Sequence, residues 1–117
     1  MTAVLIVAFD GLQPSQIDPH RMPVLSKFAD AGVRFLHNHS VFPSVTRTNA
    51  ATIVTGVRPG KHGLTANKSM FPEYSTNQVV DALHPKLSEI NQLTKGKLLF
   101  VPTIGEVIRK HHLQWVS

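Results

Sequence analysis

The feature that most constrains the fold is an unbroken apolar segment near the start of the chain, Ala3–Phe9, which reads AVLIVAF. It is rich in branched residues and shows no alternation with polar ones. A strand with one face in water alternates, whereas a strand covered on both faces is apolar throughout. The segment therefore predicts a central strand of a parallel sheet that has helices on both sides.

Asp10 and Gly11 follow this predicted strand directly. The carboxylate of Asp10 then falls at the carboxyl end of the strand, the edge at which open α/β sheets bind ligands. The alternative is a structural one, because aspartate followed by glycine is also typical of a turn, and aspartate also caps helices. From the residues alone, both interpretations of Asp10 stay open.

The next part of the chain predicts a helix and a second strand. Pro23–Ala31 places apolar residues on one helical face, with proline in the first turn and Gly32 after the last. Val33–Val41 alternates loosely, which predicts a strand with His37 and His39 on the same face. Two such histidines can belong to a metal site, but no third ligand is near in the sequence, so a surface or packing role is the main expectation.

The most informative stretch is Phe42–Asn67, which reads FPSVTRTNAATIVTGVRPGKHGLTAN. Its small apolar run, Ala50–Val54, predicts a tightly packed helix. Gly56 and then Pro59-Gly60 give that helix a stop.

Two threonines, Thr46 and Thr48, stand where this helix is expected to begin. Unpaired backbone N–H groups and the positive end of the helix dipole favour negative charge at that point. A nucleophilic alkoxide or a bound phosphate would be stabilised there. The alternative is that one of these threonines is only the N-cap of the helix.

The remainder of the chain predicts short elements. Asn77–Leu83 and Lys86–Leu93 could each form a short helix, and Leu98–Phe100 a short strand. Thr103–His111 predicts a helix with an apolar face and with basic residues in its last turn.

Composition excludes several functional classes. The sequence has no cysteine, so disulfides and cysteine-ligated zinc are ruled out. Its formal charge of +5 is scattered along the chain, which fits anionic small molecules better than a nucleic-acid surface. No apolar run approaches the roughly 20 residues that span a bilayer, and no leader peptide is visible, so we expect no membrane segment and, by default, a cytoplasmic location.

Three separated segments together resemble one protein family. They are VAFDGL at the first predicted strand, SVTRTNAATIVTG at the predicted helix and RPGKHGLTAN after it. They resemble the alkaline phosphatase superfamily, in particular its type I phosphodiesterase/nucleotide pyrophosphatase branch. The resemblance implies a three-layer α/β/α sandwich with a mainly parallel sheet. Residues 1–117 would be the N-terminal part of a single catalytic domain of that kind.

The resemblance also implies roles for individual residues. Asp10 matches a metal-ligating aspartate, and Thr46 matches the nucleophile, which also binds a metal. Asn67 lies 21 positions after Thr46 and matches an asparagine that hydrogen-bonds a phosphoryl oxygen. Two divalent metal ions are implied, with zinc expected, and their remaining ligands are expected downstream of Ser117.

Other positions of the motif have weaker implications. Arg47 stands where the family often has an aromatic residue, so it could bind a second phosphate or an acidic leaving group, or it could point to solvent. Asn49 is expected to hold the turn before the helix. His62 is expected to have a structural role.

The function implied is metal-dependent hydrolysis of phosphodiester or pyrophosphate bonds through a phospho-threonine intermediate, with a small anionic phosphoester or a nucleotide as substrate. The 117 residues alone are expected to be inactive or nearly so. A phosphonoacetate-type hydrolase of C–P bonds and a non-catalytic anion-binding module are the alternatives. Uncovered sheet edges and apolar surface would favour self-association.

Overall fold

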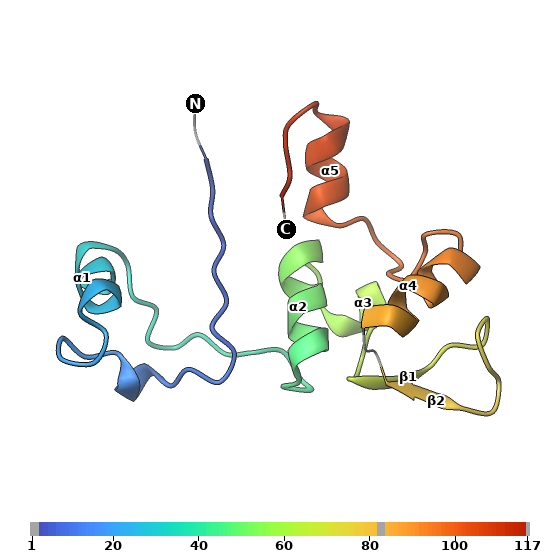
Figure 1. Ribbon diagram of the computed structural model, residues 1–117, viewed down its shortest axis with the longest axis horizontal. Coiled ribbons are helices and arrows are strands. Elements are labelled where there is room, and N and C mark those ends of the chain that lie inside the picture. Colours follow the sequence, from blue (N-terminus) through green and yellow to red (C-terminus); the bar gives the residue numbers. More distant parts are fainter. Residues whose placement is uncertain (1–2, 82–83, 117) are drawn as a thin grey trace. The chain divides into compact units, whose positions relative to one another are not determined.

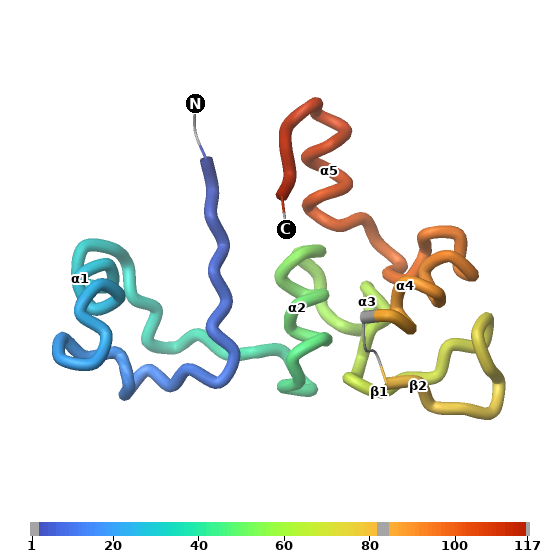
Figure 2. The backbone as a smooth tube through the Cα atoms, in the orientation of Figure 1, coloured from blue at the N-terminus to red at the C-terminus, as the bar shows by residue number. Residues whose placement is uncertain are grey.

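The computed structural model describes residues 3–81 and 84–116 of the chain. The chain divides into two compact units, Met1–His39 and Ser40–Ser117. Within the described residues these units contain five α-helices, one 3₁₀-helix and two short strands (Figures 1 and 2). The structure therefore has α/β character, but the parallel sheet of a three-layer sandwich is not seen in this part of the chain.

The first unit contains a 3₁₀-helix, η1 (Pro14–Gln16), and a helix, α1 (Pro23–Ala31). The bounds of α1 are those that the sequence predicted, with proline at the first position and Gly32 as the C-cap. Proline and glycine act locally on the backbone, so the sequence alone was sufficient to place both ends of this helix.

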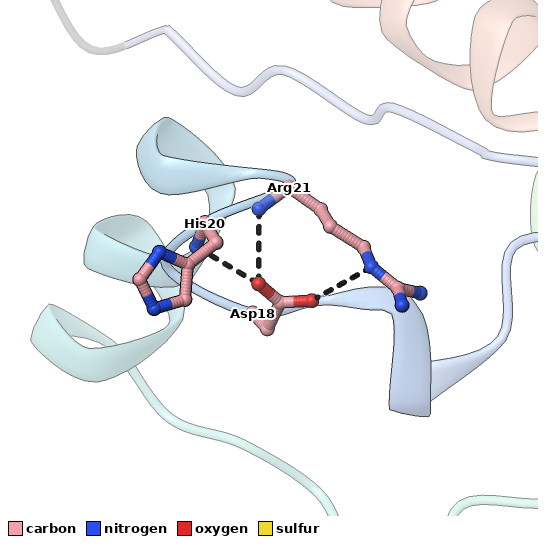
Figure 3. Close-up of polar contacts among 3 residues, drawn as sticks. All are labelled: Asp18, His20 and Arg21. Carbon is pink, nitrogen blue, oxygen red and sulfur yellow. Dashed lines mark hydrogen bonds and ion pairs between the residues drawn. The ribbon is translucent and has the colours of Figure 1, made fainter.

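The segment between η1 and α1 is organised by the carboxylate of Asp18 (Figure 3). Its Oδ1 accepts the backbone N–H groups of His20 at 2.8 Å and of Arg21 at 2.9 Å. Its Oδ2 lies 3.4 Å from Nε of Arg21. These contacts close a turn that leads into α1, so Asp18 has a structural role.

The two long strands predicted for this region are not formed in the part of the chain that the structure describes. Ala3–Phe9 follows an extended path in Figure 2, but it is not paired in a sheet, and its Val4 is 86% exposed. Val33–Val41 likewise contains no strand. A strand exists only through backbone hydrogen bonds to a neighbour. The one ladder among the described residues joins β1 to β2.

The second unit begins with a helix, α2 (Thr46–Thr55), and a short helix, α3 (Pro59–His62), which pack against each other. Gly56 ends α2 in the left-handed conformation, at φ 69°, and its N–H reaches the carbonyl of Thr52. The sequence therefore predicted the stop of α2 correctly at Gly56. Pro59, however, begins α3 and does not end the preceding helix.

After α3 the chain forms an antiparallel ribbon of two strands, β1 (Lys68–Met70) and β2 (Val79–Asp81). The predicted helix Asn77–Leu83 is wrong over its described part, and residues 82 and 83 lie outside the described residues. Two consecutive β-branched valines favour a strand once a partner is present. Val80 is also buried, with 2% of its surface exposed.

Two further helices complete the unit, α4 (His84–Leu93) and α5 (Ile104–Lys110). Both were predicted, whereas Leu98–Phe100 is not a strand. The start of α5 is fixed by a capping box, in which Thr103 Oγ1 accepts the N–H of Glu106 and Glu106 Oε2 accepts the N–H of Thr103. The hydrogen bond from the Thr103 backbone lowers the pKa of Glu106.

The buried apolar side chains of the described residues all lie in this second unit. They come from α2, from the segment after α3, from β2 and from α4, and they are Ala51, Leu64, Val80 and Ile90. Helix α2 also contacts α5. This small core positions the beginning of α2, where the candidate site lies.

Candidate functional site

The candidate nucleophile, Thr46, is the first residue of α2. The N-cap is Val45, whose backbone is extended and whose side chain makes no capping hydrogen bond. The alternative that Thr46 or Thr48 is the N-cap is therefore wrong. The first turn of α2 contains no acidic residue, so no carboxylate opposes the positive end of the helix dipole beside Thr46.

Asn49 holds the backbone that leads into α2. Its Oδ1 accepts the N–H of Val41 at 3.1 Å, and its Nδ2 donates to the carbonyl of Val45 at 3.0 Å and to that of Pro43 at 3.4 Å. The prediction that Asn49 holds this turn is confirmed. One amide side chain thereby fixes the segment that ends at Thr46.

Asn67 lies at the same end of α2. Its Oδ1 accepts the backbone N–H of Arg47 at 3.1 Å, which satisfies one of the unpaired donors of the first helical turn. Since Oδ1 accepts this bond, the amide has a defined orientation, in which Nδ2 is the donating side of the group. The structure thus brings Asn67 to the residue next to Thr46, although 20 residues separate Arg47 from Asn67.

The side chain of Arg47 points toward the ribbon. Its Nη2 lies 3.8 Å from Oδ1 of Asp81, the last residue of β2. Sequence reasoning missed Asp81, because the segment was predicted as a helix and nothing in its composition linked it to Arg47. Among the described residues, the second unit therefore gathers Thr46, Arg47, Asn67 and Asp81 around the beginning of α2.

In the same unit, a buried histidine links α3 to α2. His62 is fully buried, and its Nδ1 accepts the N–H of Leu64 at 3.2 Å. Its Nε2 must then carry the proton, which it donates to Oγ1 of Thr52 at 3.0 Å. The hydroxyl of Thr52 donates in turn to the carbonyl of Thr48 at 2.9 Å. Burial lowers the pKa of His62, so its neutral form is favoured.

These contacts confirm the structural role predicted for His62. The imidazole joins α3 to α2 through the hydrogen bond from Nε2 to Thr52, its Nδ1 accepts the N–H of Leu64, and the ring has no access to solvent. Thr48, whose carbonyl accepts the hydroxyl of Thr52, is also fully buried, and its Oγ1 has no hydrogen-bond partner among the residues that the structure describes.

Asp10 belongs to the other unit, where it follows the extended segment Ala3–Phe9. Gly11 has φ 79°, and the N–H of Leu12 reaches the carbonyl of Phe9 at 3.4 Å, so Asp10 lies in a turn. Both expectations for this residue are compatible with that position. The structure describes Asp10 and the Thr46 site in separate units.

The donor chemistry of Asp10 and Thr46, a carboxylate and a hydroxyl, suits a hard or borderline divalent ion. Across residues 3–81 and 84–116, no three acidic or histidine side chains gather into a group that could hold a metal by themselves. The two predicted ligands therefore fit a metal in kind but do not complete a site.

No helix in the described part of the chain has both the length and the apolarity to cross a bilayer.

Comparison with known proteins identifies relatives of the chain. Residues 4–112 match the family model of type I phosphodiesterase / nucleotide pyrophosphatase. The bis(5'-adenosyl)-triphosphatase ENPP4 of Homo sapiens is 33% identical over 79 residues, which cover 68% of this chain and 17% of that protein. An ectonucleotide pyrophosphatase/phosphodiesterase of Caenorhabditis elegans is 33% identical over 72 residues, 62% of this chain and 9% of that protein.

A pyrophosphatase/phosphodiesterase of Schizosaccharomyces pombe is 25% identical over 114 residues, which cover 97% of this chain and 23% of that protein. The chain thus spans less than a quarter of the length of each of these three relatives. No solved structure matches it.

Proposed function

The chain belongs to the type I phosphodiesterase/nucleotide pyrophosphatase family, and from this premise we propose that it is the nucleophile-bearing part of an enzyme that hydrolyses phosphodiester or pyrophosphate bonds. The observation that carries the proposal is the hydrogen bond of 3.1 Å from the Arg47 N–H to Asn67 Oδ1. It places the amide of Asn67 at the beginning of α2, next to the hydroxyl-bearing residue Thr46.

In the proposed reaction Thr46 Oγ attacks phosphorus and loses its proton. A P–O bond to the leaving group breaks, and the leaving oxygen departs with the bonding electron pair. Water then attacks the same phosphorus, the P–O bond to Thr46 Oγ breaks, and a proton from the water passes to that oxygen, which releases the phosphate product and restores the Thr46 hydroxyl. This sequence balances without any external oxidant or reductant.

The residues around Thr46 have separate parts in this scheme. The positive end of the α2 dipole stabilises negative charge on the threonine oxygen and on the transferring phosphoryl group. The Nδ2 group of Asn67 donates to a phosphoryl oxygen, since its Oδ1 is engaged by Arg47. Asn49 keeps Val45, and hence Thr46, in place. Arg47 supplies positive charge for an anionic substrate.

We further propose that two divalent metal ions, zinc by the chemistry of the donors, serve this site. Asp10 and Thr46 would hold them together with ligands from outside the 117 residues. When bound, such ions lower the pKa of a coordinated hydroxyl and neutralise phosphoryl charge. The proposal accounts for a threonine nucleophile, because a free hydroxyl is a weak nucleophile at neutral pH.

The three-layer sandwich is proposed on the same premise. Ala3–Phe9 is continuously apolar, and its Val4 and Leu5 are 86% and 85% exposed. A segment of this kind is stabilised when neighbouring strands and helices cover both of its faces. We propose that it is a central strand in the complete protein. The 117-residue chain alone is then expected to self-associate, whereas a clean monomer in light scattering at high concentration would oppose this.

A non-catalytic anion-binding module is the second candidate. It is favoured by the presence of Thr46, Arg47 and Asn67 in one compact unit, Ser40–Ser117. Such a module would bind phosphate at the beginning of α2 without turnover. A phosphonoacetate-type C–P hydrolase stays an alternative within the same threonine chemistry.

The test is hydrolysis of bis-p-nitrophenyl phosphate with added zinc. The longest reading frame that contains this chain is compared with residues 1–117, each with and without Thr46→Ala. The proposal predicts activity in the long form that Thr46→Ala abolishes, and little or none in the short form. A Thr46→Ala enzyme with full activity would refute the role of Thr46. Phosphate binding without hydrolysis in either form would favour the module.

A further inference from the structure

The ion pair between Arg47 and Asp81 is a feature that the proposed chemistry leaves unexplained. Nη2 of Arg47 lies 3.8 Å from Oδ1 of Asp81, and the two side chains are 29% and 42% exposed. No other ion pair is present in the described part of the second unit. A partly exposed pair of this kind contributes little to stability, so its position matters more than its strength.

The ribbon explains why Asp81 is found at this point. In the ladder, Lys68 at the start of β1 is opposite Asp81 at the end of β2. Asn67 immediately precedes Lys68, so one end of the ribbon carries both Asn67 and Asp81. This end lies beside the beginning of α2 (Figure 1), because Asn67 accepts the backbone N–H of Arg47 while Asp81 faces its guanidinium. The ribbon end therefore holds Arg47 by both its backbone and its side chain.

This arrangement has an electrostatic consequence for the site. A guanidinium is charged at every relevant pH, and next to Thr46 it would attract a substrate group with two negative charges. The carboxylate of Asp81 offsets that charge and also directs the guanidinium toward the ribbon. When the ion pair is formed, Arg47 gives less additional attraction to a second negative charge on the substrate phosphate. A phosphate group with a single negative charge loses less by this than a dianionic one.

We propose that Asp81 is a specificity-determining positioning residue. By holding and neutralising Arg47, it favours substrates whose reacting phosphate carries one negative charge, such as diesters, over dianionic monoesters. This inference rests on the proposed function, since it concerns the substrate of the Thr46 site.

The experiment compares two substrates with the same leaving group, bis-p-nitrophenyl phosphate and p-nitrophenyl phosphate, which at pH 8 are a monoanion and a dianion. It uses the longest reading frame that contains the chain, with added zinc, and the measured quantity is the ratio of kcat/KM for the dianion to that for the monoanion. Asp81→Asn is expected to raise this ratio roughly two- to sixfold, because the guanidinium of Arg47 is then no longer held toward the ribbon and can interact more strongly with the second negative charge of the dianion.

Arg47→Gln separates an effect through Arg47 from a direct effect of Asp81. If Asp81 acts by holding Arg47, Asp81→Asn changes the ratio in the wild-type background and leaves it unchanged in the Arg47→Gln background. Glu89→Gln is the matched control. It removes one carboxylate from the exposed face of α4, where no described residue forms an ion pair with it, and should leave the ratio unchanged.

Two results would overturn the inference. One is an unchanged ratio in Asp81→Asn, and the other is the same change in both backgrounds, which would show a direct action of the carboxylate. If no Thr46-dependent hydrolysis is found at all, the proposed function itself fails. Calorimetric binding of inorganic phosphate to the same variants then decides the inference, since only an Arg47-dependent tightening in Asp81→Asn supports it.

Discussion

The replacement of Asn49 by alanine tests how the chain positions its candidate nucleophile. The substitution removes an acceptor for Val41 N–H at 3.1 Å and donors to the carbonyls of Val45 at 3.0 Å and Pro43 at 3.4 Å. Two of these bonds have ordinary length, and each is worth about 1 kcal/mol net. The third is long and adds little.

Two smaller effects modify this sum. Asn49 is only half-buried, so water can reach part of the vacated groups and limits the penalty. Alanine also favours the helix over asparagine by about 0.5 kcal/mol. We therefore expect Asn49→Ala to lower the free energy of unfolding by about 1 to 2 kcal/mol. In the long form it should also reduce kcat by roughly tenfold or more, because Thr46 loses its fixed position.

The assay is urea unfolding followed by far-UV circular dichroism, with two comparison variants. Asn49→Asp keeps an acceptor for Val41 but turns a carboxylate oxygen toward two carbonyls, so it should destabilise at least as much as alanine. Asn91→Ala makes the same chemical change at an exposed position of α4 and should have an effect within about 0.5 kcal/mol. Equal stabilities of Asn49→Ala and Asn91→Ala would refute the role given to Asn49.

Three further predictions concern the packing beneath the site. Burial lowers the pKa of His62 from 6.5, so as the pH falls the unfolded chain takes up this proton before the folded chain does. The stability that neutral His62 contributes is therefore complete above about pH 6.5 and declines as the pH falls below that value. In His62→Gln, the unfolding midpoint should depend less on pH between pH 7 and pH 5. Thr48→Val removes a buried hydroxyl without a described partner and should raise the midpoint of thermal unfolding, by about 1 kcal/mol in stability, whereas a decrease would indicate that the hydroxyl is bonded. Gly63→Ala should cost about 1 to 3 kcal/mol in urea unfolding, because φ is 85° and the new Cβ would lie 2.6 Å from the ring of Phe100; the cost should fall in a Phe100→Ala background.

The parts of the fold that the sequence predicted well are those that local residues determine. The bounds of α1 follow from Pro23 and Gly32, the end of α2 from Gly56, and the start of α5 from Thr103. Each of these residues acts on backbone groups within one helical turn. The sequence pattern was therefore sufficient for these helix ends, but it did not predict α3 and wrongly predicted a helix over the described part of Asn77–Leu83.

The strands were not predictable in the same way. Apolar character indicated that Ala3–Phe9 is suited to a sheet, but a ladder also requires a partner, which a single segment does not specify. The same limitation applied to β2, whose pairing with β1 depends on a contact across the loop 71–78. A periodic pattern over a short segment could not distinguish it from a helix.

The candidate site likewise contains residues whose roles follow from the local motif and residues whose contacts depend on distant parts of the chain. Asn49 was assigned its structural role from its place in the motif, and the structure confirms that role with three hydrogen bonds. The contact between Arg47 and Asp81 could not be foreseen, because it depends on the register of the ribbon. The roles of Asp10, Thr46 and Asn67 in catalysis stay predictions.

The most direct test of the central claim is the capture of a covalent adduct on Thr46. The long form is mixed with bis-p-nitrophenyl phosphate and zinc, quenched in acid within one turnover, digested and analysed by mass spectrometry. The proposed function predicts a phosphoryl adduct on the peptide that contains Thr46, absent from the Thr46→Ala enzyme. An adduct on another residue, or hydrolysis by Thr46→Ala at the rate of the unmodified enzyme, would contradict it.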